Sequence, residues 1–391
     1  MKIALLTEVF LPKIDGITNR LRHTLQCLEE EGHECLLFAP DTAVAQHGAT
    51  RVVRIPSLPF PKYPGVRVAL PDPRLLASLA AFRPQVVHAV GPAALGVMGI
   101  GAARALALPI VASYHTDFPR YLPGYGLGFA ERAIWPLIRA VHGAAHVNLC
   151  PSEFTRLELE EHGVRSVGIW RGGVDAELFH PRKRSLAMRL RLSGGRPEGP
   201  LLLYVGRLSP EKNLASFAEI LRGVPGAQLA LVGDGPARAE LEATFAREAA
   251  EGRVHFAGFL RGEELAEAFA SADLFVMPSK TETLGFVVLE AMAAGLPVVA
   301  AHAGGLSDLV RPEENGLLYH PDRPREAAEA IRRILGHEGR RRLFARLARK
   351  SAEGASWSAE TRRLLDAYRR AIVLARQSRG AVRRLGALLL A

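Results

Sequence analysis

The chain alternates short apolar runs with segments of helical periodicity, and it does so in two rounds. The first round predicts strands at 2–6, 34–38, 52–55, 85–88, 109–113, 146–149 and 167–170, with helices such as 18–31 and 152–161 between them. The second round predicts strands at 201–205, 228–232, 254–256, 274–277 and 297–300. Strands that alternate with helices form parallel sheets. The sequence therefore predicts an α/β protein with two Rossmann-like, doubly wound sheets facing a central cleft.

Domain boundaries follow from the break between the two rounds. A length of 391 residues suits two domains. Residues 171–199 are rich in Gly, Arg and Pro, which is typical of an interdomain connection. We expect an N-terminal domain at 1–175, a linker at 176–199 and a C-terminal domain at 200–355. Residues 356–391 are predicted to form a C-terminal helix with a basic tail that packs back toward the N-terminal domain.

The net charge of +10 is concentrated at the C-terminal end, where residues 340–391 carry 14 basic and three acidic side chains. Seven-residue spacing places many of these arginines on one face of a helix and apolar residues on another. The arginines are Arg362, Arg363, Arg369, Arg370, Arg376, Arg383 and Arg384. Such a helix favours contact with anionic lipid headgroups. The alternative is a solvated face on a helix packed against the protein body. A nucleic-acid partner is not expected, because no binding motif accompanies the charge.

The sequence favours the cytoplasm. No apolar run reaches the roughly 18 residues of a membrane-spanning helix, and the N-terminus has a strand pattern rather than a signal-peptide pattern. The three cysteines are odd in number and lack metal-ligand spacing, which suits a reducing compartment. We expect a cytoplasmic protein, either soluble or peripheral on the inner face of the membrane.

The turn after the strand at 201–205 carries two cations. Arg207 and Lys212 lie five residues apart in Gly-Arg-Leu-Ser-Pro-Glu-Lys. A diphosphate leaving group needs such positive charge because negative charge accumulates on it as the bond to the sugar breaks. The alternative for Lys212 is an ordinary solvated lysine.

The segment 281–290 contains the densest group of candidate residues. Gly285 precedes a predicted helix at 286–294, so backbone amides there can approach a phosphate at the positive end of the helix dipole. Glu282 precedes this helix, and Glu290 lies inside it, where a carboxylate suits sugar or ribose hydroxyls. The alternatives are that Glu282 caps the helix and that Glu290 forms an ion pair.

Three further segments end strands or open helices. Gly233-Asp-Gly-Pro ends a strand, and Asp15-Gly-Ile-Thr precedes a helix in the first domain. His115 follows the strand at 109–113, where ligands of parallel sheets bind, although a structural histidine is an equal alternative.

The sequence lacks the motifs of several large classes of nucleotide-binding enzyme. The first strand is not followed by Gly-x-Gly-x-x-Gly, which argues against a dinucleotide oxidoreductase. The phosphate-binding loop Gly-x-x-x-x-Gly-Lys-Ser/Thr and an Asp-x-Asp metal clamp do not occur either.

Taken together, these segments resemble the family-4 retaining glycosyltransferases of GT-B fold. The most specific part is Glu282 to Glu290 within Pro-Ser…Glu-x-x-Gly-Phe…Glu-Ala-Met-Ala-x-Gly-x-Pro-Val-Val. Gly-Arg-Leu-x-x-Glu-Lys, Val-Gly-Asp-Gly-Pro and Asn315-Gly-Leu-Leu agree with it. The segments Ser113-Tyr-His-Thr and Trp170-Arg-Gly-Gly-Val-Asp are similar to GDP-mannose-dependent lipid mannosyltransferases and sulfoquinovosyl-diacylglycerol synthases.

The resemblance implies how a donor would bind. Arg207 and Lys212 would hold the diphosphate. Backbone amides of Gly285, Phe286 and Val287 would bind its phosphate or the sugar. The catalytic set would be His115, Glu282, Arg207 and Lys212.

Other roles implied by the resemblance concern the sugar and the ribose. Glu282 and His115 would contact the transferred hexose, and Glu290 the ribose hydroxyls. Gly16 would let the N-terminal loop approach the sugar, although Asp15 stands where many members have a second glycine. Members retain anomeric configuration without an established protein nucleophile, and the leaving phosphate takes the acceptor's proton. No metal and no cofactor beyond the donor are implied.

The resulting hypothesis is transfer of a hexose from a GDP- or UDP-sugar to a membrane lipid, with the first domain on the acceptor side. A soluble saccharide acceptor is the alternative within the class. A nucleotide-sugar epimerase of the same architecture and a non-catalytic binding module are the alternatives outside it.

Overall fold

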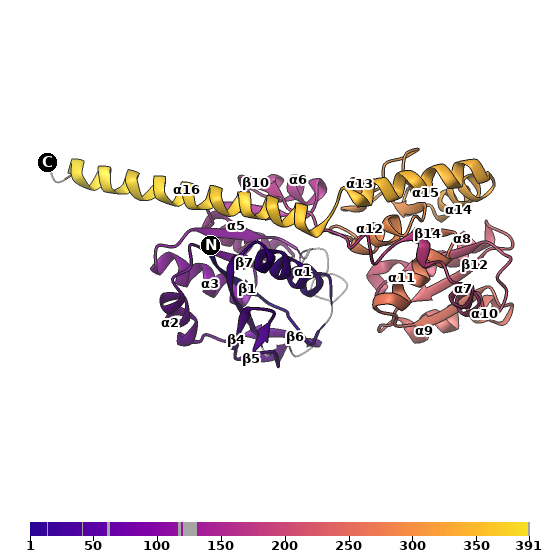
Figure 1. Cartoon of the computed structure of the whole chain (residues 1–391), viewed down its shortest axis with the longest axis horizontal. Coiled ribbons are helices and arrows are strands. Elements are labelled where there is room, and N and C mark those ends of the chain that lie inside the picture. The colour runs from indigo at the N-terminus through magenta and orange to yellow at the C-terminus, as the bar shows by residue number, and fades with distance from the viewer. Residues whose placement is uncertain (14, 41, 61–62, 116–118, 120–130, 390–391) are drawn as a thin grey trace. The chain divides into compact units, whose positions relative to one another are not determined.

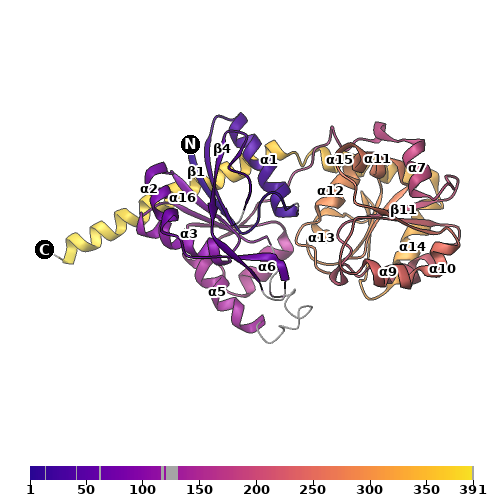
Figure 2. The ribbon, with the colours of Figure 1, turned by 90° about the horizontal axis from the view of Figure 1, so that it is seen from below.

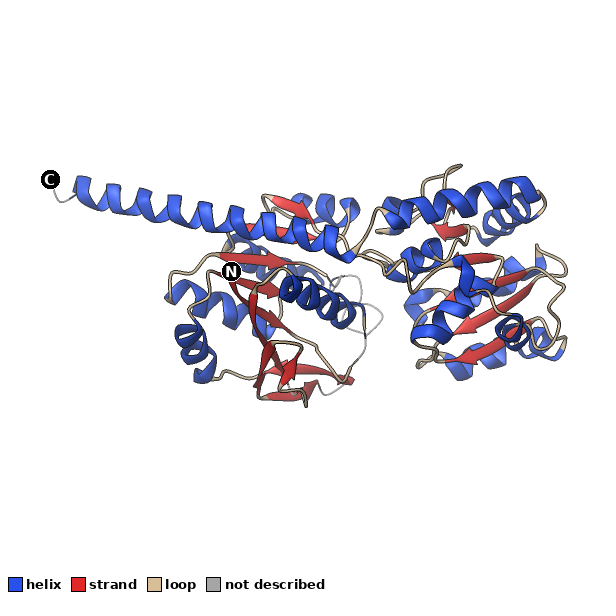
Figure 3. Ribbon diagram, in the orientation of Figure 1, coloured by secondary structure: helices blue, strands red, loops and turns tan. Residues whose placement is uncertain are grey.

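The computed structural model describes residues 1–13, 15–40, 42–60, 63–115, 119 and 131–389. The chain divides into two compact units: unit 1 contains Met1–Arg171 and Trp357–Ala391, and unit 2 contains Gly172–Ser356. Each unit has a largely parallel sheet with helices packed on it (Figure 3). The chain therefore builds most of unit 1, then unit 2, and returns to unit 1 for its last helix.

Unit 1 contains an eight-stranded sheet of order β10-β9-β8-β7-β1-β2-β4-β3. Neighbouring strands pair in parallel, except that β3 and β4 are antiparallel. Each strand predicted in this half has a counterpart whose ends differ by at most two residues. The strands are β1 (Lys2–Thr7), β2 (Glu34–Pro40), β3 (Gln46–His47), β4 (Thr50–Ile55), β7 (Val86–Val90), β8 (Ile110–Ser113), β9 (Val147–Cys150) and β10 (Val167–Ile169).

Helices cover both faces of this sheet because its strands are apolar on both sides. On β1, Ile3 and Leu5 pack with residues of α1 and α16, whereas Ala4 and Leu6 pack with residues of α2 and α3. The helices are α1 (Gly16–Glu30), α2 (Pro73–Phe82), α3 (Ala94–Ala105), α5 (Glu131–Gly143), α6 (Glu153–Glu161) and α16 (Trp357–Leu389). The predicted helix start at Ser152 is confirmed, since its side chain accepts a hydrogen bond from the amide of Thr155.

A separate antiparallel hairpin, β5 (Ser57–Phe60) with β6 (Tyr63–Ala69), lies between β4 and α2. The sequence pattern predicts no strand there. The strand pattern of this segment is obscured by its prolines, because proline is tolerated in a sheet only in exposed strands; they are Pro59, Pro61 and Pro64.

The last helix, α16, is part of the core of unit 1. Its inward residues recur at the spacing of one helical face and are at most 1% exposed; they are Leu364, Leu365, Tyr368 and Ala371. The arginines of the seven-residue repeat whose burial the structure describes lie on the exposed side; they are Arg362, Arg363, Arg369, Arg370 and Arg376. The C-terminal end of α16 runs on past the other elements of unit 1 (Figures 1 and 2). The alternative of a solvated basic face on a packed helix therefore describes α16 up to about Ala375.

Unit 2 is built on a six-stranded parallel sheet of order β13-β12-β11-β14-β15-β16. The first five strands along the chain match the predicted ones, and β16 was not predicted. The strands are β11 (Leu201–Val205), β12 (Gln228–Val232), β13 (Val254–Gly258), β14 (Leu274–Met277), β15 (Val298–Ala301) and β16 (Gly316–Tyr319).

Helices surround this sheet, and one apolar core runs through the unit. The α-helices are α7 (Leu186–Leu192), α8 (Phe217–Arg222), α9 (Arg238–Thr244), α10 (Ala246–Ala250), α11 (Gly262–Ser271), α12 (Phe286–Ala293), α13 (Leu306–Leu309), α14 (Pro324–Leu335) and α15 (Glu338–Glu353). Short 3₁₀ turns are η3 (Pro181–Lys183), η4 (Pro210–Lys212) and η5 (Leu214–Ser216). Within the stretch 176–199, α7 places Met188 and Leu192 in this core.

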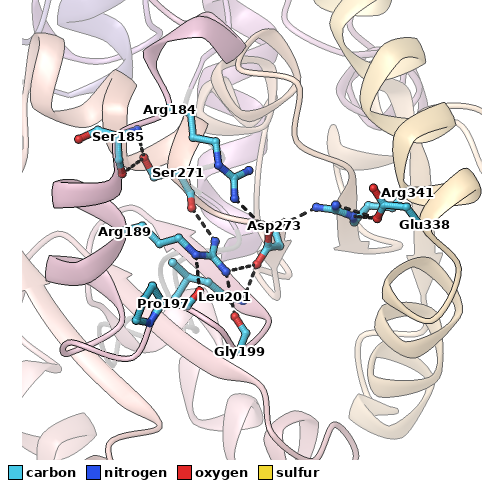
Figure 4. A network of polar contacts seen from close by, with 10 residues as sticks. All are labelled: Arg184, Ser185, Arg189, Pro197, Gly199, Leu201, Ser271, Asp273, Glu338 and Arg341. Carbon is cyan, nitrogen blue, oxygen red and sulfur yellow. Dashed lines mark hydrogen bonds and ion pairs between the residues drawn. The ribbon is translucent and has the colours of Figure 1, made fainter.

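A polar network around Asp273 fixes the segment before β11 (Figure 4). One carboxylate oxygen of Asp273 accepts hydrogen bonds from the Arg189 guanidinium at 2.8 Å and from the amide of Leu201 at 2.9 Å. The two ionic side chains are only 10% and 11% exposed, and the Arg189 guanidinium also donates to three backbone carbonyls. Since Leu201 starts β11 and Asp273 precedes β14, the network lies at the amino ends of these strands.

Leu364→Ala tests whether α16 is an integral part of unit 1. We expect it to lower the free energy of unfolding by about 2–5 kcal/mol, because it leaves a cavity in the core. Val373→Ala, in the same helix but 50% exposed, should cost no more than about 0.5 kcal/mol. Denaturant unfolding followed by circular dichroism measures both, and equal effects of the two variants would contradict the packing.

Candidate active site

The predicted donor residues lie in loops that follow the carboxyl ends of neighbouring strands in unit 2. One loop begins at Gly206 after β11, one at Gly233 after β12, one at Pro278 after β14 and one at His302 after β15. Ligands of parallel sheets bind at this edge. The strand order therefore brings these four loops to one edge of the sheet.

The Gly-Asp-Gly turn supports the loop that carries Arg207. A Cβ atom at Gly233 would lie 2.0 Å from the carbonyl oxygen of Gly206, and one at Gly235 would lie 2.3 Å from that of Leu208. The amide of Leu208 donates to the carbonyl of Asp234 at 3.0 Å. The two glycines thus permit backbone-to-backbone packing, and Arg207 is exposed at the outer side of its loop.

Lys212 and Glu282 form an ion pair. The ammonium nitrogen of Lys212 lies 2.5 Å from Oε1 of Glu282, and the two side chains are 15% and 16% exposed. Lys212 ends η4 after β11, and Glu282 lies in the loop after β14, the strand next to β11. Lys212 is therefore not a solvated lysine. Glu282 does not cap α12 either, since the N-cap residue is Gly285 and no side chain caps this helix.

Gly285 opens α12 in a left-handed conformation with φ of 92°. A side chain there would be strained, and its Cβ would lie 2.9 Å from the Leu306 side chain. The first amides of a helix have no partner within the helix, so those of Phe286 and Val287 mark its positive end. Gly285, Phe286 and Val287 thus follow Glu282 in the same segment after β14, with Gly285 three residues after Glu282.

The sequence analysis missed the glycine pair that supports this loop. The amide of Gly305 donates to the carbonyl of Glu282 at 2.7 Å. A Cβ atom at Gly304 would lie 2.2 Å from the same carbonyl oxygen, and one at Gly305 would lie 2.3 Å from that of Thr283. The signal was available, because Gly-Gly follows a buried strand after two intervening residues and leaves room for another backbone.

Glu290 lies in α12, and burial raises the pKa of its carboxyl to about 8. Within the described ranges its carboxyl makes no hydrogen bond or ion pair with another protein group, so the ion-pair alternative is not observed. A largely buried carboxyl without a partner is costly in its charged form. It is suited to accept hydrogen bonds from hydroxyl groups of a ligand.

His115 follows β8 in unit 1 and is 8% exposed. Its Nε2 atom lies 2.8 Å from Oγ of Ser113, and its ring contacts Trp170 edge-on at 5.3 Å between centroids. Burial, together with the positive charge of Arg20, lowers the pKa of His115 well below its ordinary value. The imidazole is therefore neutral at physiological pH.

Gly16 is the exposed first residue of α1. Asp15 is the N-cap of this helix, and its carboxylate accepts a hydrogen bond from the amide of Thr18 at 2.9 Å. A glycine at position 15 could not make this contact. The departure at Asp15 therefore has a structural reason in this chain.

The described residues contain neither a candidate metal site nor a candidate membrane-spanning helix. No group of three or more His, Cys, Asp and Glu side chains is arranged to hold a metal ion in this part of the chain. No helix within the same residues is both long and apolar enough to span a membrane.

Two protein families match the chain in succession. The model of glycosyltransferase family 4 matches residues 14–178, and that of group 1 glycosyl transferases matches residues 192–351.

Similar proteins of named activity include two at nearly 40% identity. The sulfoquinovosyl transferase SQD2 of Arabidopsis thaliana is 39% identical, covering 90% of this chain and 70% of that one. A GDP-mannose-dependent alpha-mannosyltransferase of Mycobacterium tuberculosis is 38% identical, covering 94% and 96%. An alpha-monoglucosyldiacylglycerol synthase of Streptococcus pneumoniae is 29% identical, covering 82% and 75%.

Solved structures share the fold. A sucrose-phosphate synthase from Thermosynechococcus elongatus has a TM-score of 0.77 at 24% identity, covering 95% of this chain and 99% of that one. Anabaena HepE in complex with UDP and glucose has a TM-score of 0.74 at 22% identity, covering 94% and 98%.

These findings define the protein as a glycosyltransferase of GT-B fold with two Rossmann-like units. Within that class the chain belongs to glycosyltransferase family 4, as the sequence analysis predicts. The epimerase and binding-module alternatives do not describe it.

Glu290→Gln tests the raised pKa of Glu290. Its pKa is about 8 in the folded chain and near 4.5 in the unfolded one, so the folded state loses stability as pH rises between these values. Relative to Glu290→Gln, wild-type protein should lose on the order of 2–4 kcal/mol of unfolding free energy between pH 5 and about pH 8.5. Denaturant unfolding across this pH range measures the difference.

Glu240→Gln, at an exposed site on α9, is the matched control and should follow wild type. Parallel pH profiles for wild type and Glu290→Gln would show that Glu290 is ionised in the folded protein at neutral pH.

Proposed function

We propose that this chain transfers a hexose from a GDP- or UDP-sugar to a membrane lipid, with retention of anomeric configuration and without a metal ion. The Lys212–Glu282 pair is the observation that carries the proposal, because it joins a cation from the loop after β11 to a carboxylate in the loop that leads into α12. The relative named as GDP-mannose-dependent supports the donor type, and the relative named as an alpha-monoglucosyldiacylglycerol synthase supports a lipid acceptor.

In this proposal the donor diphosphate binds near Arg207, Lys212 and the first amides of α12. Negative charge grows on the diphosphate as the glycosidic bond breaks, and fixed positive groups stabilise it more in the transition state than in the ground state. The leaving phosphate takes the proton of the acceptor hydroxyl. Glu282 then needs no catalytic proton and serves as a hydrogen-bond acceptor for the hexose.

The two units have different tasks in this proposal. Unit 2 binds the nucleotide, with Glu290 accepting hydrogen bonds from the ribose hydroxyls. Unit 1 is the acceptor-side unit, from which His115 and Gly16 meet the transferred sugar.

A thermal-shift screen with GDP, UDP and ADP and their sugar conjugates, with and without EDTA, tests the donor. We expect one base to stabilise the protein and EDTA to leave the shift unchanged. Transfer assays with diacylglycerol and with free sugars then distinguish lipid from saccharide acceptors. Absence of any nucleotide shift would contradict the proposal, and an EDTA-sensitive shift would contradict its metal-free form.

Lys212→Ala and Glu282→Ala test the site. Each removes one charged partner from the reacting centre, so kcat should fall by about 10²–10³-fold in a radiolabelled transfer assay. Lys280→Ala is the matched control. Lys280 lies two residues before Glu282 and pairs with Asp322 at 2.5 Å, but both side chains are well exposed. Wild-type activity in either site variant, or an equal loss in the control, would contradict the assignment.

We propose that the lipid acceptor is reached by peripheral contact of unit 1 with an anionic membrane at its cytoplasmic face. Up to about Ala375 the apolar face of α16 packs in the core of unit 1, and the helix presents exposed arginines such as Arg370, Arg376 and Arg379 to the membrane. Each basic side chain near an anionic surface contributes about 1 kcal/mol.

The β5–β6 hairpin supports the same contact. Four of the 12 exposed large apolar side chains in the described residues lie between positions 58 and 76. Leu58 and Val68 are cross-strand partners and therefore share one face, with Leu70 two residues further on. The segment 51–76 carries five basic residues and one acidic residue. Exposed apolar side chains with surrounding positive charge favour an anionic lipid surface.

Vesicle flotation tests both surfaces. Replacing Arg370, Arg376 and Arg379 by glutamine should weaken binding to phosphatidylglycerol vesicles at least tenfold and reduce its salt dependence. Leu58→Ser with Val68→Ser should weaken binding even at high salt. The control replaces Arg342, Arg346 and Lys350 on α15, which changes the charge equally. Unchanged affinity in all variants would contradict membrane contact through these surfaces.

A further inference from the structure

Four buried side chains of unit 1 form a continuous chain of hydrogen bonds that ends at His115. The hydroxyl of Tyr368, from α16, lies 2.8 Å from Nδ1 of His88, on β7. The other ring nitrogen of His88 lies 2.8 Å from Oγ of Ser113, at the end of β8. The same Oγ lies 2.8 Å from Nε2 of His115. The first three residues are fully buried, and His115 is 8% exposed.

The burial of Tyr368 determines which atoms donate and which accept along this series of hydrogen bonds. Within the described part of unit 1, the Tyr368 hydroxyl has His88 Nδ1 as its hydrogen-bond partner and no other. Burial also raises the pKa of Tyr368 well above its ordinary value, so the phenol keeps its proton. If His88 donated to Tyr368, the buried hydroxyl hydrogen would lack an acceptor, which is costly. Tyr368 therefore donates, and Nδ1 of His88 accepts.

The direction of this first hydrogen bond determines the proton positions on His88, Ser113 and His115. A neutral imidazole carries one proton, so His88 is protonated on Nε2 and donates to Oγ of Ser113. The hydroxyl hydrogen of Ser113 is then directed to Nε2 of His115. His115 must in turn carry its proton on Nδ1.

Charge does not disturb this arrangement. Burial and the nearby Arg20 lower the pKa of His88 to about 3, and the same causes act on His115 together with His88 and His142. Arg20 itself donates to the carbonyl of Trp170 at 3.0 Å and stacks on its ring at 4.6 Å. His88 and His115 are therefore both neutral, and each is held in one tautomer.

We propose that Tyr368, His88 and Ser113 are positioning residues that hold His115 in its Nδ1-protonated tautomer. In that form Nδ1 donates a hydrogen bond and cannot accept a proton, so a ligand group that meets it must be an acceptor oxygen. The tautomer rests on these contacts and on the burial that keeps both histidines neutral. Its use to bind a hexose oxygen rests on the proposed function.

The proposal gives α16 a role in the site. Its Tyr368 lies 280 positions from His88 in sequence and supplies the first proton donor of the chain. A general-base role for Nδ1 of His115 is excluded by the same chain, which agrees with proton transfer to the leaving phosphate.

Nitrogen-15 NMR of histidine-labelled protein tests the tautomer directly. We expect His115 to show a protonated Nδ1 and an unprotonated Nε2 in wild type, with signals assigned through His115→Asn. Tyr368→Phe keeps the ring but removes the donor, and Ser113→Ala removes the link. Each should convert His115 to a tautomer mixture. Tyr319→Phe is the control, because the Tyr319 hydroxyl is buried in unit 2 without a hydrogen-bond partner in the described residues.

Binding assays separate positioning from general damage. Tyr368→Phe should weaken sugar-nucleotide binding about three- to tenfold and leave binding of the free nucleotide unchanged. His115→Asn, whose amide can donate from the position of Nδ1, should retain more sugar-nucleotide binding than His115→Gln or His115→Ala.

A protonated Nε2 on His115 in wild type, or an unchanged tautomer in both Tyr368→Phe and Ser113→Ala, would overturn the proposal. If the tautomer changes in the variants but sugar-nucleotide binding does not, the hydrogen-bond chain is supported and the proposed contact of His115 with the hexose is contradicted.

Discussion

Parallel pairing of strands directs every carboxyl end in a sheet to the same edge, and both units depend on this constraint. In unit 2, Lys212 and Glu282 are 70 residues apart, yet they meet because β11 and β14 are neighbours. In unit 1, His115 follows β8 at the corresponding edge. The loops at this edge can approach one another closely only where side chains are missing, as at Gly233 and Gly304. The chemistry of the site thus depends first on topology and then on glycine.

At the opposite edge of the unit 2 sheet, Asp273 is a buried carboxylate with a structural role. Asp273 is surrounded by donors from Arg189, Leu201 and Arg341, which together offset the cost of burying it. Glu290 is also largely buried, but it has no such partners in the described part of unit 2. The difference between the two carboxyls lies in their hydrogen bonds rather than in their burial, and it is the reason that we propose a ligand contact for Glu290 and not for Asp273.

Much of this could be predicted from sequence, because the signals are local. Apolar runs predicted the strands, Ser152 predicted a helix start, and the turn containing Arg207 and Lys212 predicted a cationic loop. The β5–β6 hairpin was missed because prolines obscure its pattern, and Gly304 because its partner is another loop. The contact between His88 and Tyr368 has no local signal at all. A histidine in one strand and a tyrosine in the last helix become partners only when that helix packs on the sheet.

The packing of α16 on the sheet of unit 1 also explains why the arginines from Arg362 to Arg376 lie on the exposed side of this helix. Leu364, Leu365 and Ala371 cover the sheet of unit 1, so Arg369 and Arg370 between them lie on the exposed side of the helix, where Arg369 pairs with Asp366. Tyr368 lies in the same buried stripe but carries a polar tip, which a purely hydrophobic interface would replace by phenylalanine. A buried hydroxyl persists without penalty only where it has an acceptor, and here the acceptor is His88. In our proposal, the position of that hydroxyl therefore links the packing of the C-terminal helix to the tautomer of His115.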